Sequence, residues 1–344
     1  MAHVLVRTLS EEHPIAPPAI AIAIRRLWGS VRSFDSTPFP MVTSSPLQSC
    51  KHELDPSPEA FGELRASADD LDRPEVLRQR LDDDGYLFIP GFFDRDLILE
   101  ARASVIARLV AEDALDPAFP PDEAMARPDR AMAYRGDFAL NNPAIDRVVF
   151  GPELLDFYEA LFSEPVRHFD HIWYRAVSHG QGTPPHCDLV YMSRGTHELL
   201  TCWIPYGEVP LEVGGLMLLE HSHRQSERLK NYLAVDVDLY CENDPRQVEK
   251  VKEQGAWSHP GWLTHNPVVL QKRLGGRWLT TAWQPGDFLT FKMTMVHGSL
   301  DNQTHRIRLS SDTRYQRASQ PADERWIGPN PVGHGKAGKR GRIC

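Results

Sequence analysis

Two histidines and an aspartate have the types and spacing that suit a metal ion. His186 and Asp188 are separated by one residue in the segment TPPHCD, and residues two apart on an extended strand project to the same side. His297 follows a strand-like segment and precedes Gly298-Ser299, where a strand is expected to turn. Two imidazole nitrogens and one carboxylate oxygen on one face of an octahedron leave the opposite face open. This is typical of non-haem iron(II) that binds a co-substrate and dioxygen.

A His-x-Asp pair alone is weak evidence of a metal site. The chain has 15 histidines and 47 acidic residues, and His168 with Asp170 forms a second such pair. A strand-surface histidine beside a solvated acid is the commoner arrangement. Arg308 strengthens the first pair, because it lies eleven residues after His297 in a strand-like segment. A guanidinium directed inward binds a carboxylate through two parallel hydrogen bonds.

The composition restricts the class of protein. An apolar fraction of 41% over 344 residues is enough for a packed core, and a formal charge of -9 disfavours nucleic acid as a partner. The best apolar run, residues 19–24, is far shorter than the roughly 20 residues that cross a bilayer. We expect a cytoplasmic protein that acts on a small-molecule substrate, with no nucleic acid and no membrane as partner. The pattern does not indicate an oligomeric state.

The cysteines show no C-x-x-C pair and are odd in number, so we expect free thiols in a reducing compartment. They are Cys50, Cys187, Cys202, Cys241 and Cys344. By strand alternation, Cys187 should point away from the metal and into the core.

The elements that must position these residues change along the chain. Residues 1–70 are rich in proline, serine and mixed charge and are expected to form an extended or partly disordered leader. Residues 71–320 are expected to form the folded domain, and residues 321–344 a C-terminal tail. Helices are expected from Pro74 to a stop at Gly85, after Asp94, and over 152–162, with a strand over 86–90.

After Pro165 the hydrophobic period shortens towards two, and β-branched and aromatic residues become frequent. Six or more short strands separated by glycine, proline and aspartate predict a β-sandwich or barrel with helices placed N-terminally. Residues 223–277 interrupt this run with charged, helix-prone stretches. An insertion of this length in a β-core usually covers or shapes a site, as a lid does.

The motifs together resemble the phytanoyl-CoA dioxygenase family of iron(II)- and 2-oxoglutarate-dependent oxygenases. The resemblance runs from about Asp84 to Gln316. It begins with DGYLFIPGFFDRDLI, passes through TPPHCD and VGGLMLLEHSHR, and closes with QPGDFLTFKMTMVHGSLDNQTHRIR. The last segment is the most specific, because its His, Gly, Ser, Asn, Thr and Arg match the family's spacing together.

The resemblance implies a fold and a set of roles. The fold would be mainly β with flanking α, a double-stranded β-helix of the jelly-roll or cupin-like type with N-terminal helices packed on it. His186, Asp188 and His297 would bind Fe(II) and form the catalytic centre. Arg308 would bind the distal carboxylate of 2-oxoglutarate, and Ser299 and Trp203 would line its pocket. The reaction would consume O2, release succinate and CO2, and hydroxylate a C–H bond.

The sequence departs from the family pattern on the substrate side. His221 stands where the turn usually carries glycine, and a long segment runs from Ser226 to Gly276. Halogenating relatives have a small residue at the acidic ligand, so Asp188 favours hydroxylation. Four further residues are candidates for contact with substrate or co-substrate: Arg135, Tyr174, Arg175 and Tyr191. Each could instead be an interior tyrosine or part of a surface ion pair. Loop residues that either form a lid or fold back on the core are Trp257, His259, Trp262 and His265.

Two alternatives remain open at the sequence level. A cupin-like protein would hold a metal or a small ligand without turnover, and a zinc-dependent hydrolase would use the same three ligands with a bound water. Arg308 distinguishes them from an oxygenase, because neither has a use for a carboxylate clamp at that position. The hydrolase also lacks an evident general base.

Overall fold

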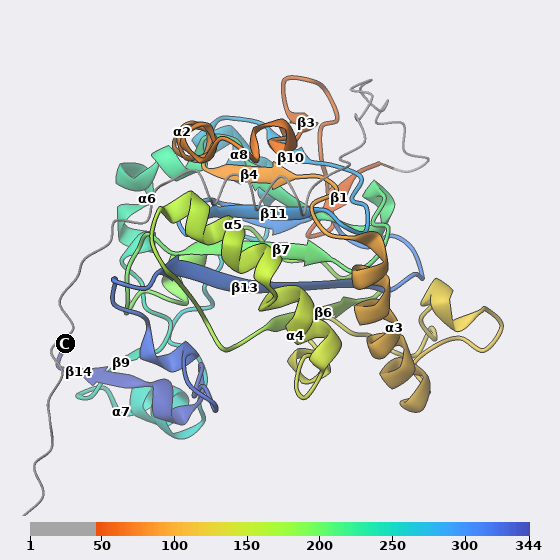
Figure 1. The fold of residues 1–344 in the computed structure, drawn as a ribbon. Coiled ribbons are helices and arrows are strands. Elements are labelled where there is room, and N and C mark those ends of the chain that lie inside the picture. The colour runs from red at the N-terminus through yellow and green to blue at the C-terminus, as the bar shows by residue number, and fades with distance from the viewer. Residues whose placement is uncertain (1–45) are drawn as a thin grey trace, which may run out of the picture. The chain divides into compact units, whose positions relative to one another are not determined.

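Two facing β-sheets form the centre of the computed structural model, which describes residues 46–344 (Figure 1). The larger sheet has the order β4-β11-β7-β13-β5, with β6 also paired to β13. Its strands are β4 (Tyr86–Ile89), β5 (Val166–His168), β6 (Trp173–Val177), β7 (Leu200–Pro205), β11 (Phe288–Lys292) and β13 (Arg308–Arg317). The smaller sheet has the order β12-β8-β10-β3, with β3 (Phe61–Glu63), β8 (Leu216–Leu219), β10 (Trp278–Thr280) and β12 (His297–Ser299).

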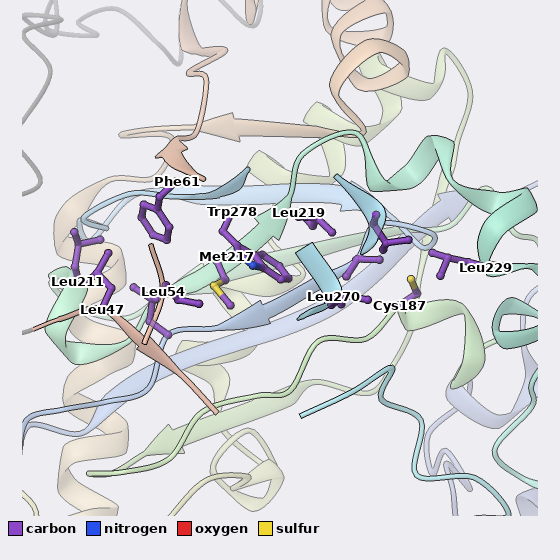
Figure 2. Packing of buried hydrophobic residues seen from close by; sticks show 13 residues of the cluster. Leu47, Leu54, Phe61, Cys187, Leu211, Met217, Leu219, Leu229, Leu270 and Trp278 are labelled. Carbon is purple, nitrogen blue, oxygen red and sulfur yellow. The ribbon is translucent and has the colours of Figure 1, made fainter. Parts of the chain in front are cut away.

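Strand alternation divides the core into two layers. On β8, Leu216 and Leu218 face the larger sheet and share a cluster with Trp203 of β7. The neighbouring residues Met217 and Leu219 face the opposite side. There they pack in a second cluster with Phe61, Trp278 and Cys187, which Figure 2 shows gathered together. The smaller sheet is therefore covered on both faces.

The chain crosses repeatedly between the two sheets after β6. It passes from β7 to β8 and, later, from β11 through β12 to β13, and the neighbours are antiparallel apart from β3 with β10. This alternation of strands between two facing sheets is that of a double-stranded β-helix. The expected fold class is confirmed.

Helices cover the larger sheet, as Figure 1 shows for α5 in front of β13. They are α2 (Pro74–Asp84), α3 (Arg95–Ala111), α4 (Pro143–Val149) and α5 (Pro152–Phe162). Tyr158 of α5 stacks on Tyr315 of β13 with ring centroids 4.1 Å apart and donates a hydrogen bond to Thr290 Oγ1. The expected boundaries are confirmed at Asp94, whose side chain caps α3, and at Gly85, which ends α2 with φ +81°.

The folded region begins earlier than the sequence analysis predicts. Within the expected leader, residues from Gln48 onward form β1 (Gln48–Ser49), β2 (His52–Glu53) and β3, which pairs in parallel with β10. Leu47, Leu54 and Phe61 of this segment are buried in the core. The prediction missed them because apolar residues spaced this widely, on strands of two or three residues, show no period. Residues 1–45 of the expected leader lie outside the described residues.

The insertion and the expected C-terminal tail fold against each other. The insertion contains α6 (Ser226–Leu233), β9 (Leu239–Cys241), α7 (Pro245–Gln247), the π-helix η7 (Val248–Glu253) and α8 (Pro267–Leu274). β14 (Arg340–Arg342) pairs in parallel with β9 (Figure 1). Cys241 and Cys344 form a disulfide, so the expectation of free thiols is wrong for these two. Pairing of residues 103 apart has no local sequence signal.

A buried ion cluster also holds the C-terminal segment. Asp238, fully buried, accepts hydrogen bonds from Arg325, His334 and Lys339.

The expectation for Cys187 is confirmed, because it is buried and its thiol contacts Thr294 O at 3.4 Å. Within residues 46–344, no helix is both long enough and apolar enough to cross a membrane.

Candidate metal centre

The structure brings His186, Asp188 and His297 together inside the barrel. All three are buried, and one potential ligand atom from each lies within 4.8 Å of the others. Asp188 Oδ1 is 3.6 Å from His186 Nε2 and 3.7 Å from His297 Nε2. Among residues 46–344 this is the one group of three or more such side chains that can share an ion.

Backbone pairing sets the spacing of the two histidines. His297 is the first residue of β12, and its main chain exchanges two hydrogen bonds of 2.9 Å with the main chain of His186. The expected strand over 186–188 is wrong in detail, because His186 makes an isolated bridge and Asp188 begins the 3-10 helix η4 (Asp188–Val190). Cys187 is extended, and that single residue is enough to bring both ligands to one side.

Hydrogen bonds orient each side chain towards the same point. His186 Nδ1 lies 2.8 Å from Pro184 O and His297 Nδ1 lies 3.0 Å from Met295 O, so each ring directs Nε2 inward. Asp188 Oδ2 accepts from Thr201 Oγ1 at 2.5 Å and from Arg314 Nη2 at 2.7 Å, which leaves Oδ1 facing the imidazoles.

The protonation states suit a cation. Burial lowers the pKa of His297 to about 3, so its imidazole is neutral at physiological pH and Nε2 keeps a lone pair. Burial alone would raise the pKa of Asp188, but the guanidinium of Arg314 outweighs it and holds that pKa well below the usual range. Two imidazoles and one carboxylate, with oriented second partners, fit an iron(II) ion.

A narrow inner cavity adjoins these ligands and contains Arg308, Ser299 and Trp203. Arg308 is buried, donates from Nη1 to Gly214 O, and has no hydrogen-bond partner at Nε among the described residues. Burial lowers the pKa of Arg308 to about 9, which leaves it protonated at neutral pH. A buried cation with an unsatisfied donor suits a carboxylate. The space is about 30 Å³, so a dicarboxylate enters only if lining side chains shift.

A second cavity of about 600 Å³ opens on the other side of His186 and Asp188. Of the further candidates, Arg175, Tyr191, Trp257 and Trp262 line it. The others do not: Tyr174 is buried against Phe138 and Tyr206, Arg135 forms surface ion pairs with Glu112 and Asp137, His259 binds a loop amide, and His265 packs on Trp262. The second His-x-Asp pair, His168 and Asp170, is partly exposed and belongs to no group of three potential ligands within residues 46–344.

Asp312 and Arg314, which lie on β13 with Arg308, were not among the residues predicted from the sequence. Arg308, Asp312 and Arg314 share the inward face, and Asp312 accepts from Arg314 Nη1 at 2.5 Å and from Arg175 Nε at 3.1 Å. A sequence signal for them was present, because charged residues alternate along this strand. A buried strand tolerates such residues only when they are paired.

The sequence also matches a known family over the region that builds this site. The profile described as phytanoyl-CoA dioxygenase matches residues 81–310, which include the three candidate ligands and Arg308. The chain belongs to the phytanoyl-CoA dioxygenase family. It is thereby an oxidoreductase of the iron(II)- and 2-oxoglutarate-dependent oxygenase class, as the resemblance implied.

Individual relatives of this dioxygenase family are distant. The 1-deoxypentalenic acid 11-beta-hydroxylases of Streptomyces exfoliatus and Streptomyces arenae are each 26% identical, over 72% of this chain and 83% of their own length. Among solved structures, the α-ketoglutarate-dependent epimerase SnoN is 21% identical, with a TM-score of 0.48, over 75% of this chain and 92% of that one. HygX from Streptomyces hygroscopicus, with nickel and 2-oxoglutarate bound, has a TM-score of 0.44 at 15% identity, over 72% of this chain and 87% of that one.

Proposed function

We propose that this protein hydroxylates a C–H bond of a small molecule, with His186, Asp188 and His297 as the iron ligands and Arg308 as the clamp for 2-oxoglutarate. The observation that carries the assignment is that Nε2 of both histidines and Oδ1 of Asp188 converge beside the buried guanidinium of Arg308, which has an unsatisfied donor. When bound, iron(II) would activate O2, which is the oxidant, while 2-oxoglutarate would be oxidised to succinate and CO2 as the substrate C–H bond is hydroxylated.

The chain's own residues orient and separate the reactants. The two histidines and Asp188 would hold the ion where it adjoins the cavities. Thr201 and Arg314 hold Asp188 Oδ2, so that oxygen is not available as a second ligand. Ser299 Oγ accepts a hydrogen bond from Thr183 N at 2.8 Å, which leaves its hydroxyl proton free for the co-substrate. Trp203 supports the inner cavity as a buried wall.

The other two functions receive less support from the site. A zinc hydrolase needs a general base near the bound water. The carboxylates that line the two cavities in the described part of the chain are Asp188 and Asp312, and both are paired with arginine. A ligand-binding protein without turnover gives no reason for an acid-binding guanidinium beside the metal ligands. An acidic ligand at 188 also leaves no place for a halide, which favours hydroxylation.

Anaerobic absorption spectroscopy tests the assignment. Adding 2-oxoglutarate to the iron(II)-loaded protein is expected to give a weak visible charge-transfer band. Arg308→Ala should raise the concentration of 2-oxoglutarate that gives half of this band by about tenfold or more, because one charged hydrogen-bonding partner is lost. Iron affinity should stay close to that of the wild type.

The matched control is Arg95→Gln, which removes an exposed guanidinium that is paired only with Glu208 at 3.4 Å on the surface. It should give the wild-type titration. Metal-loaded protein without the band would exclude the oxygenase assignment, and unchanged 2-oxoglutarate binding in Arg308→Ala would remove that residue from it.

A further inference from the structure

The wall of the larger cavity is rich in aromatic side chains. Four tryptophans contribute to it from distant parts of the chain: Trp173, Trp257, Trp262 and Trp326. Trp173 comes from β6, Trp257 and Trp262 from the insertion, and Trp326 from the C-terminal segment. Rigid indole rings favour a bulky apolar ligand, and about 600 Å³ is a typical volume for a pocket that encloses a drug-sized molecule.

Two of the cavity's basic side chains are already committed. Arg314 binds Asp188 and Asp312 and stacks on Trp173 at 4.3 Å. Burial lowers the pKa of His171 to about 4, so it is neutral at physiological pH, and its Nε2 lies 3.1 Å from Tyr134 Oη. Neither is available to neutralise an acidic ligand.

Arg175 is differently placed. Its Nε donates to Asp312 Oδ1 at 3.1 Å, and the side chain makes no other hydrogen bond within residues 46–344. The side chain is 26% exposed and lines both cavities, so its terminal nitrogens are accessible at their boundary. The hydrogen bond from Nε to Asp312 orients the guanidinium and leaves its terminal nitrogens for a second carboxylate.

The charge balance of the site also favours an anion. Among the described residues that line the two cavities, the carboxylates are those of Asp188 and Asp312, and the guanidiniums are those of Arg175, Arg308 and Arg314. Iron(II) and 2-oxoglutarate carry equal and opposite charges, so loading them leaves one positive charge in excess. A ligand with one negative charge would restore the balance.

We infer that the substrate is a bulky, mainly apolar molecule with one carboxylate, which Arg175 binds while the aromatic wall encloses the hydrocarbon. This inference rests on the proposed function, because it takes the larger cavity as the substrate site of that reaction. A coenzyme A thioester does not fit the same description. Its several phosphate charges would meet a single available guanidinium.

Binding without turnover tests the inference. The protein is loaded with nickel(II) and 2-oxoglutarate and titrated with abietic acid, a tricyclic carboxylic acid, and with the matching primary alcohol, abietinol. Quenching of tryptophan fluorescence reports occupancy, because four indoles line the cavity. Wild type should bind the acid about ten- to a hundredfold more tightly than the alcohol, the range expected for a hydrogen bond to a charged group.

Variants assign the preference to one side chain. Arg175→Gln should bind acid and alcohol alike, Arg175→Lys should keep part of the preference, and the surface control Arg95→Gln should keep all of it. The inference is overturned if wild type does not prefer the acid, if neither probe binds, if palmitoyl-CoA binds more tightly than abietic acid, or if Arg175→Gln retains the preference.

The charge-transfer band separates this inference from the proposed function. If the band forms in wild type and in Arg175→Gln but the acid preference is missing, the substrate class is wrong and the oxygenase assignment stands. If Arg175→Gln weakens 2-oxoglutarate binding as strongly as Arg308→Ala does, Arg175 serves the co-substrate and the inference fails. Absence of the band in wild type counts against the proposed function itself.

Discussion

Asp188 uses its two carboxylate oxygens for different tasks. Oδ1 faces the imidazoles, while Oδ2 accepts from Thr201 and Arg314. Arg314 in turn bridges Asp188 to Asp312, so one guanidinium pairs with two buried carboxylates. Such outer contacts set the direction and the basicity of a ligand, and their loss is felt at the metal.

Replacing Arg314 by leucine should therefore weaken metal binding by about 10- to 100-fold. The variant leaves Asp188 and Asp312 buried without their shared partner, so the apoprotein should also be less stable. Anaerobic calorimetric titration with iron(II) measures the affinity, and circular dichroism checks the fold. Thr201→Val is the control, because it removes a neutral donor from the same oxygen and should have a smaller effect. Equal metal affinity in wild type and Arg314→Leu would exclude this role.

At the scale of elements, the C-terminal segment forms part of the cavity wall. Trp326, Gly333 and His334 line the larger cavity, and the segment is held by the Asp238 cluster, by pairing of β14 with β9 and by the Cys241–Cys344 disulfide. The expected tail is thus a structural part of the candidate substrate site. Its anchors come from the insertion, so the two regions should loosen together.

Replacing Cys344 by serine should lower the free energy of unfolding by about 2–4 kcal/mol, since the disulfide closes a long loop in the unfolded chain. Thermal unfolding of the variant measures this as a lower Tm. A reductant should lower the Tm of wild type towards that of the variant and leave the variant unchanged. Cys50→Ser, at a free and half-buried thiol, is the control. A wild-type Tm that does not respond to the reductant would contradict the prediction.

What the sequence could predict depended on local signals. The end of α2 at Gly85 and the start of α3 at Asp94 have local chemical causes, and the strand patterns follow side-chain alternation. The grouping of the three candidate ligands was predictable because a family pattern spans them. Arg314 was missed because Asp188, the carboxylate that it holds, is 126 residues away in the chain, and the Cys241–Cys344 pair because its two cysteines are 103 residues apart with no local signal. Arg175 was named only as one of several candidates, because its proposed role depends on the two cavities that it lines.

At the scale of the whole molecule, residues 46–63 complete the core of the smaller sheet. Phe61 is 1% exposed, and β3 pairs with β10. The family match begins at residue 81, so this segment stabilises the barrel from outside the matched region.

Phe61→Ala should lower the free energy of unfolding by about 3–5 kcal/mol, because it leaves a cavity in the cluster of Figure 2. Urea unfolding measures the change. Phe119→Ala is the matched control: that ring is 42% exposed, so its loss should alter stability by about 0.5 kcal/mol or less. If the two variants were equally stable, residues 46–63 would be only loosely attached.

On the proposed assignment, the reciprocal backbone bonds between His186 and His297 link metal uptake to chain synthesis. A ribosome-bound chain that has not yet produced β12 would lack one proposed ligand and the strand that pairs with the other. We therefore expect metal loading only once the barrel is complete.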